Sequence, residues 1–199
     1  MKLVGILMAF LFSIEFCQAS PQKRVGFSWD SVRSWAIQDR GRIKPYDTFA
    51  RESLVYVTGK NQWKGLSAAE VTFGWLISLD KEWQDEEFIR VDYKPLKELL
   101  GLEVKRQYFR PSEMDNLSGL DKILREASQK ESRKERLSTL EKKAIELQNK
   151  KGLLESIVGG SALVILPNPK GQQETWFPLS SLTDGGSLPY ASDKRDGFA

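Results

Sequence analysis

The residues best suited to binding chemistry lie in one short basic segment, RGRIKPYDTFARE, at positions 40–52. It contains four cationic side chains, Arg40, Arg42, Lys44 and Arg51. The planar guanidinium group of arginine donates two parallel hydrogen bonds to a carboxylate. We therefore expect this segment to suit a carboxylate ligand, such as a haem propionate or the C-terminus of a peptide.

The same charges have a second interpretation, as ordinary ion pairs on the surface. Asp39, Asp47 and Glu52 lie among the basic residues and can neutralise them, since charge runs usually form solvated faces. A phosphate-binding loop is not indicated, because Gly41 alone between two arginines does not make a G-x-G-x-x-G motif.

Tryptophan side chains are the second group of candidates, and the sequence has six of them. Trp29 and Trp35 flank the basic segment, so we expect them to be the better candidates for contacting a ligand. Trp63, Trp75 and Trp83 could line a flat apolar ligand. Most tryptophans are core or interface residues, and its helical spacing places Trp75 in the core first.

Two absences exclude several classes of catalytic site. The sequence has no histidine, and its single cysteine is Cys17. A Ser-His-Asp triad, a Cys-His pair and a zinc site of His and Cys are therefore excluded within this chain. No paired-carboxylate motif stands out, so we expect no enzyme activity and no bound metal. A net charge of only +3 gives no case for nucleic-acid binding.

The N-terminus has the pattern of a secretory signal peptide. Residues 1–19 combine Lys2, the apolar run at 3–12, and Ala19 at the expected cleavage site. We expect cleavage after Ala19 and a periplasmic or otherwise extracytoplasmic location. An uncleaved anchor and a lipoprotein acylated at Cys17 are the alternatives. After cleavage the protein has no cysteine and depends on its apolar core.

The basic segment also contains signals for a structural corner. Gly41 permits a turn and Pro45 fixes the entry into the next element. Asp47 is the expected N-cap of a helix at 48–58, with Gly59 as its C-terminal stop. The corner motif comprises Gly41, Pro45, Asp47, Thr48 and Glu52.

Further elements follow from caps and periodicity. Ser67 and Glu70 form a capping box that opens a second helix to about Leu79. Alternating residues at 88–93 and 103–109 predict two strands around a short helix that begins at Pro95. Between 112 and 151 the leucine spacing predicts two helices, or one long helix with a solvated middle. An apolar strand is expected at 161–167, followed by a turn at 168–171 and a segment at 176–182 that either pairs or packs back.

These elements predict a helix-rich α+β exported domain with a small β element and a Lys/Glu-rich helical excursion. The expected divisions are a signal peptide (1–19), an N-terminal α/β part with the corner (20–110), the helical excursion (111–158), a C-terminal β part (159–182) and a flexible tail (183–199).

The segment Trp35–Glu52 resembles part of the bacterial system II cytochrome c biogenesis proteins, the ResB/CcsA-type cytochrome c synthetases. The downstream order is also similar, with T-G-K after the first helix, a capped Trp-bearing helix, a Lys/Glu-rich helical region and the run L-V-I-L-P-N-P. The resemblance extends over residues 35–182. The residues carried over from the motif are Gly41, Arg42, Lys44, Pro45, Asp47, Thr48, Arg51 and Glu52.

That resemblance implies a role in attaching haem covalently to exported apocytochromes. The family's chemistry resides in membrane helices with haem-ligating histidines, which this chain lacks. It therefore implies an accessory extracytoplasmic subunit or domain that docks to a multi-span membrane cytochrome c synthetase, with apocytochrome c as a second candidate partner. Haem is expected only through a partner. The alternatives are a generic periplasmic protein-interaction module and a solute-binding protein, for which the chain is short.

Overall fold

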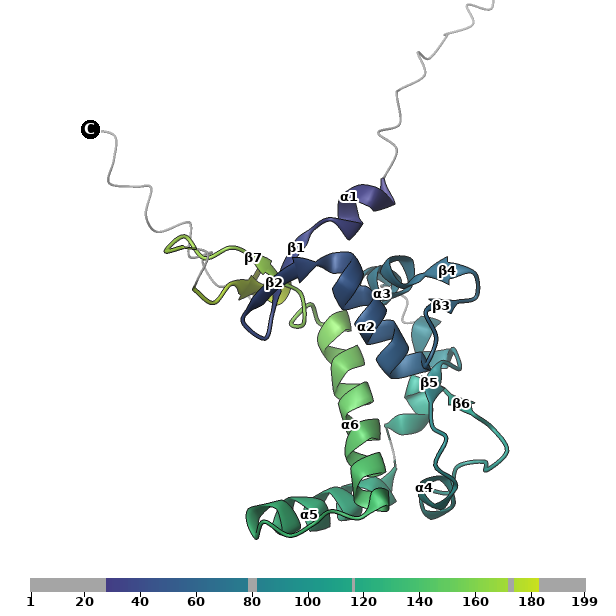
Figure 1. Cartoon of the computed structure of the whole chain (residues 1–199). Coiled ribbons are helices and arrows are strands. Elements are labelled where there is room, and N and C mark those ends of the chain that lie inside the picture. The colour runs from purple at the N-terminus through teal and green to yellow at the C-terminus, as the bar shows by residue number, and fades with distance from the viewer. Residues whose placement is uncertain (1–27, 79–81, 116, 172–173, 183–199) are drawn as a thin grey trace, which may run out of the picture.

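The computed structural model describes residues 28–78, 82–115, 117–171 and 174–182 (Figure 1). The expected signal peptide with Cys17, residue Leu79 and the expected tail at 183–199 lie outside the described residues. The expected α+β class is confirmed, because helices are combined with short antiparallel strand pairs. Within the described ranges, no helix is both long enough and apolar enough to cross a bilayer.

The elements follow one another as α1 (Trp29–Arg33), β1 (Ala36–Asp39), β2 (Arg42–Pro45), α2 (Tyr46–Thr58), β3 (Gln62–Trp63), β4 (Leu66–Ser67), α3 (Ala68–Ile77), the 3-10 turn η1 (Glu82–Asp85), β5 (Ile89–Arg90), α4 (Lys94–Leu99), β6 (Tyr108–Phe109), η2 (Pro111–Met114), α5 (Ser118–Ser132), α6 (Thr139–Val158), β7 (Val164–Leu166), β8 (Phe177–Pro178) and η3 (Leu179–Leu182).

The basic segment forms an antiparallel hairpin. In its register Ala36 faces Pro45 and Asp39 faces Arg42, so Arg40 and Gly41 make a two-residue turn. Both have positive φ, 51° and 75°, as the type I′ hairpin turn requires. The turn expected at Gly41 is confirmed, whereas the two strands beside it were not foreseen.

The start of α2 differs from the prediction. Pro45 occupies the N-cap position without a side-chain hydrogen bond, and the helix begins at Tyr46. The predicted N-cap role of Asp47 is therefore wrong, because Asp47 already lies inside the first turn. The extended φ and ψ of Pro45 lead the strand directly into the helix, which leaves no room for a separate cap residue. The expected C-terminal stop is confirmed, since Gly59 is left-handed.

Helix α3 packs against α2 through a buried pair of hydroxyl groups. The Tyr46 and Thr72 side-chain oxygens are 2.8 Å apart, and the Thr72 hydroxyl donates to the Ala68 carbonyl at 2.9 Å. Because Thr72 has one hydroxyl proton, the Tyr46 hydroxyl donates to Thr72. The predicted capping box of Ser67 and Glu70 is confirmed at the start of α3.

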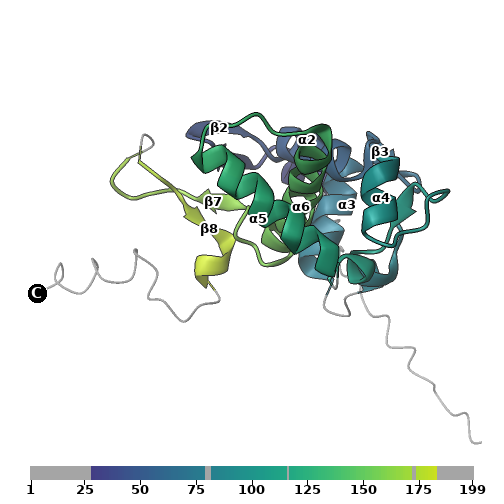
Figure 2. The ribbon, with the colours of Figure 1, turned by 90° about the horizontal axis from the view of Figure 1, so that it is seen from below.

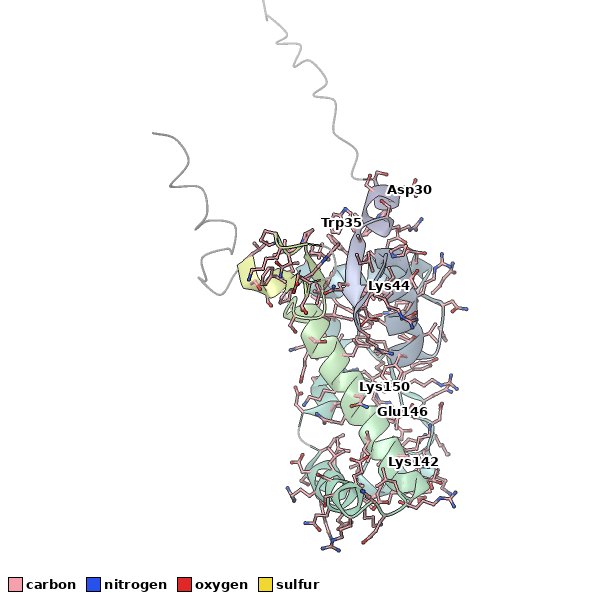
Figure 3. The ribbon with its side chains drawn as sticks, turned by 60° about the vertical axis from the view of Figure 1, so that its left-hand side comes forward. Asp30, Trp35, Lys44, Lys142, Glu146 and Lys150 are labelled. Atoms are coloured by element: carbon pink, nitrogen blue, oxygen red, sulfur yellow. The ribbon has the colours of Figure 1, made fainter. Side chains whose placement is uncertain are left out.

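Helix α6 completes the core beside α2 and α3 (Figure 1). Leu54 and Val57 of α2, Trp75 of α3 and Ile157 of α6 are all buried in one cluster. Lys150 of α6 is also buried, and its ammonium group donates to the Arg90 carbonyl at 2.8 Å. Figure 3 shows Lys150 and Glu146 on this helix. The Lys150 ammonium nitrogen lies 3.1 Å from a carboxylate oxygen of Glu146.

The Lys/Glu-rich region forms two helices, which settles the alternative left open by the sequence. Figure 2 shows α5 crossing α6 when the molecule is seen from below. A second capping box, made by Ser138 and Glu141, starts α6. Because α6 packs with α2 and α3, this region shares their core. The division of the chain at 110 and 158 stays a prediction.

The strands around α4 are shorter than expected. Only residues 89–90 and 108–109 pair, in place of the strands expected at 88–93 and 103–109. The reason is Lys97, which is buried and donates to the carbonyls of Val104 and Arg106 at 2.7 and 2.8 Å. These two carbonyls satisfy the buried ammonium group, so the loop curls around it instead of extending.

Residues 177–178 pair with the preceding strand, which is one of the two alternatives expected for the segment at 176–182. The contact of this pair with the first hairpin was not foreseen. β7 and β8 pair with a bulge, and β7 contacts β1. The Gln38 amide donates to the Glu174 carbonyl at 2.9 Å and accepts from the Trp176 N–H at 2.8 Å. This double contact attaches the basic hairpin to the end of the described chain.

We predict that the hydroxyl pair between α2 and α3 can be dissected by mutation. Tyr46→Phe removes the donor and should lower the free energy of unfolding by about 1 kcal/mol. Thr72→Val should cost more, roughly 1–3 kcal/mol, because it leaves the buried Tyr46 hydroxyl without a partner. Urea unfolding measures both, and the double variant should cost less than the sum. A Thr72→Val cost below that of Tyr46→Phe would contradict this assignment.

We also predict an acid-sensitive contribution from Glu141. Its hydrogen bond from Lys130, at 2.6 Å, and those from Ser138 lower the pKa of Glu141 to about 2. A carboxyl whose folded pKa is lowered stabilises the fold above its unfolded pKa of about 4.5 and loses that contribution as the pH falls toward 2. In the Glu141→Gln variant, the free energy of unfolding should therefore fall less between pH 4.5 and pH 2 than it does in the unaltered protein. An unchanged acid profile would exclude this contribution.

Candidate functional site

The ion-pair interpretation of the basic segment is correct for two of its four cations. The Lys44 ammonium lies 2.6 Å from carboxylate oxygens of both Asp39 and Glu52. Burial alone would lower the pKa of Lys44, but these two hydrogen bonds outweigh it and raise the pKa. Arg51 pairs with Asp47 at 2.7 Å, one helical turn away. The carboxylates beside these two side chains therefore compete with any anionic ligand.

The other two cations project from the tip of the hairpin. The Arg40 side chain is 91% exposed and lies 4.0 Å from Asp39 at its nearest. Arg42 is exposed and has no ion pair within the described residues. Ile43 beside it is 47% exposed. We call Arg40, Arg42 and Ile43 the hairpin tip. The ligand-binding role predicted for the four cations remains a prediction.

The two tryptophans that flank the basic segment contact α3. The rings of Trp29 and Trp35 both pack on Phe73, with centroid distances of 5.7 and 6.1 Å. Trp35 also lies 6.5 Å from the Tyr46 ring and is 39% exposed. Figure 3 shows Trp35 at the start of the hairpin strand and Lys44 further along the hairpin. These rings attach α1 and the hairpin to α3, and their predicted contact with a ligand remains untested.

Three of the remaining four tryptophans come together. Trp63, Trp75 and Trp83 line one groove of about 730 Å³, between α3, the β3–β4 hairpin and η1. Ligand sites in proteins usually occupy about 300–1,000 Å³. We call this cavity the tryptophan groove. The sequence indicated this trio as a possible lining for a flat apolar ligand. Trp29 and Trp35 were expected to be the better candidates for contacting a ligand.

Each tryptophan of the groove is held differently. Trp75 is buried and stacks on Phe88 with centroids 5.0 Å apart, which confirms its predicted core position. The Trp63 indole donates to Glu86 at 2.8 Å, and Lys64 pairs with the same carboxylate at 2.6 Å. Trp83 has a buried indole N–H with no acceptor among the described residues. The first two rings are therefore fixed, whereas the third lacks a hydrogen-bond partner.

The groove is acidic. Among its described lining residues, Lys64 and Arg110 face five carboxylates, Glu70, Glu82, Asp85, Glu86 and Glu87. Glu70 is engaged in the capping box, and Glu87 lies 3.2 and 3.4 Å from Arg106 and Arg110.

Two of these carboxylates remain available at the rim of the groove. Glu82 and Asp85 are exposed, and neither has an ion pair in the described part of the chain. No binding role was predicted from the sequence for the acidic residues of their segment, 80–87. Its one useful signal was the tryptophan within a run of acids, because that combination places an aromatic ring beside unpaired carboxylates.

The described residues, those of the groove included, do not form a metal-binding cluster. No group of three or more His, Cys, Asp and Glu side chains among them could hold a metal ion. Met114, one of the few potential haem ligands, is only 2% exposed.

Comparison with known proteins gives one informative similarity. No protein-family model matches the chain. Protein NrfI of Wolinella succinogenes is 28% identical to it over 147 residues, which is 70% of this chain and 15% of that protein. The chain thus spans about 15% of the length of this relative. At the level of a protein family, the similarity supports the link to cytochrome c biogenesis that the sequence motif suggested.

We predict that Ser67, which caps α3, contributes more to stability than Asp47, which lies inside the first turn of α2 and does not cap it. The Ser67 hydroxyl accepts from the Glu70 N–H and from Arg33, so Ser67→Ala should cost about 1 kcal/mol of stability. Asp47→Ala removes only an exposed ion pair with Arg51 and should cost about 0.5 kcal/mol or less. Ser138→Ala, at the second capping box, is the matched control and should resemble Ser67→Ala. Chemical denaturation yielding equal losses at Ser67 and Asp47 would contradict the assignment.

Proposed function

We propose that this chain takes part in cytochrome c maturation as an accessory extracytoplasmic subunit or domain that docks to a membrane cytochrome c synthetase. The observation that carries the proposal is the similarity to Protein NrfI over 147 residues, which agrees with the family resemblance of the segment at 35–52. The relative is much longer than this chain, so an accessory part of a larger assembly fits the comparison better than a complete synthetase.

The hairpin tip is the proposed docking surface. Because Lys44 and Arg51 are neutralised by their own carboxylates, the net positive charge of the hairpin lies at Arg40 and Arg42. Ile43 adds an exposed apolar contact between these charges and the body of the protein. The type I′ turn and the Gln38 contacts hold this tip in place, so little conformational entropy is lost when it docks.

The chemistry of haem attachment is assigned to the partner. Histidine and cysteine are the strongest iron ligands available to proteins. The sequence has no histidine, and its single cysteine is Cys17. We therefore propose that this chain is not an enzyme by itself and meets haem only through the synthetase. Apocytochrome c is the second proposed partner. The proposed extracytoplasmic location rests on the signal-like pattern of residues 1–19.

We predict that reversing the charge of the hairpin tip weakens docking. In mild detergent the protein should co-purify with a multi-span cytochrome c synthetase, and Arg40→Glu with Arg42→Glu should reduce the recovered partner. The reduction should be larger at low salt than at high salt, because exposed charges are screened beyond about 8–10 Å at physiological ionic strength. Co-purification followed by quantitative immunoblotting measures this.

The matched control is the double variant Lys122→Glu and Arg125→Glu, which changes two exposed cations on α5 by the same amount. It should leave recovery of the synthetase unchanged. Equal recovery with both double variants would exclude the hairpin tip as the docking surface. Failure to recover any synthetase with the unaltered protein would count against the proposed function itself.

A further inference from the structure

We propose that the tryptophan groove binds an extended segment of another polypeptide in which lysine or arginine alternates with apolar residues. This binding site is separate from the hairpin tip and draws on opposite chemistry, since the groove is acidic and the tip is basic. The inference holds whether or not the chain acts in cytochrome c maturation.

The charge of the groove selects a cationic partner. Its described lining has five carboxylates and two cations, and two of the exposed carboxylates, Glu82 and Asp85, have no ion pair among the described residues. Asp85 accepts only a long hydrogen bond, 3.5 Å, from the Ser112 hydroxyl. Internal cations already occupy Glu86 and Glu87. An incoming lysine or arginine would therefore meet Glu82 and Asp85 without having to displace an existing ion pair.

The aromatic walls supply the apolar half of the contact. Stacking on Phe88 and the hydrogen bond to Glu86 fix the rings of Trp75 and Trp63, so they need no reordering when a partner binds. Rigid tryptophans are common anchors at protein interfaces, and their faces also attract cations. Leu66, which is 48% exposed, extends the apolar surface at the mouth of the groove.

Gly74 leaves the groove open on the α3 side. A Cβ built at this position meets no atom within 4 Å, and Gly74 is one of the lining residues. Glycine inside a helix costs roughly 0.5–1 kcal/mol relative to alanine, a difference that corresponds to a twofold to fivefold change in the folding equilibrium. Because Gly74 lines the groove, a side chain at this position would enter the space that a partner needs.

The exposed rim favours a polypeptide over an enclosed small molecule. Glu82, Asp85 and Glu87 are exposed along the edge, so the groove resembles an open channel that an extended chain can enter from the side. Alternation in the partner follows from the lining, because Glu82 and Asp85 are exposed whereas Trp75 is buried and Trp63 and Trp83 are half-buried. Successive side chains of an extended segment point to opposite sides, so one set can reach each surface.

The test is calorimetric titration of the full chain with a capped six-residue peptide that alternates leucine and lysine. We expect one binding site. Gly74→Leu should fill the groove and weaken binding at least tenfold, while the protein stays folded because leucine favours a helix more than glycine does. Glu82→Gln with Asp85→Asn should weaken binding about threefold to tenfold, and this loss should shrink at high salt.

Matched controls separate the groove from general effects. Gly152→Leu changes another helical glycine with open space around it, on α6, and should leave binding unchanged. Asp121→Asn with Glu126→Gln removes two exposed charges of α5 and should also leave it unchanged. A leucine–glutamate peptide tests charge, a serine–lysine peptide tests the apolar contact, and both should bind at least tenfold more weakly.

Three results would overturn the proposal. The first is the absence of binding by the leucine–lysine peptide. The second is equal binding by Gly74→Leu and the unaltered protein. The third is binding that occurs only after residues 20–27 are removed, because that segment carries Lys23 and Arg24 and would then be the occupant in place of another polypeptide.

Discussion

The buried hydrogen bond between Tyr46 and Thr72 is the contact on which both candidate surfaces depend. Tyr46 is the first residue of α2 and is 1% exposed. Its backbone N–H donates to the Trp35 carbonyl at 2.7 Å, and its hydroxyl reaches Thr72 of α3 at 2.8 Å. Burial raises the pKa of Tyr46 to about 12, so the phenol stays protonated and remains a donor near neutral pH. One residue thus aligns the hairpin, α2 and α3, through its backbone N–H and its side-chain hydroxyl.

The hairpin tip and the tryptophan groove extend from this junction along different elements. β2 runs directly into α2, so the position of Arg40 and Arg42 follows from the start of that helix. Trp75 and Gly74 lie on α3, so the groove follows from the position of that second helix. Internal ion pairs leave only part of each surface available. Lys44 and Arg51 are neutralised beside the tip, whereas Glu86 and Glu87 are neutralised inside the groove.

Local signals in the sequence predicted the parts of the fold that depend on neighbouring residues. Ser67 with Glu70 and Gly59 gave correct helix limits, because capping and left-handed backbone are local chemistry. Asp47 was misassigned as a cap because a strand, which local spacing does not reveal, leads into Pro45 and starts the helix two residues early. The strand expected at 103–109 failed for another non-local reason, the buried ammonium group of Lys97.

The candidate sites, like the fold, could be predicted from the sequence only in part. The positive charge of the basic segment was evident from the sequence, but which cations are neutralised depends on a hairpin register that places Lys44 near both Asp39 and Glu52. The trio of Trp63, Trp75 and Trp83 was recognised as a possible lining. Its acidic rim was not, because the rim carboxylates lie in one short segment that only the fold brings beside Trp63 and Trp75 of other elements.

The central claim, a role in cytochrome c maturation, is tested most directly by the covalent haem content of exported proteins in a strain that lacks this gene. Haem staining of denatured extracytoplasmic proteins should show reduced c-type cytochromes, while total cellular haem stays normal and reintroducing the unaltered gene restores the signal. Undiminished c-type cytochromes in such a strain, with no second copy of the gene present, would contradict the account.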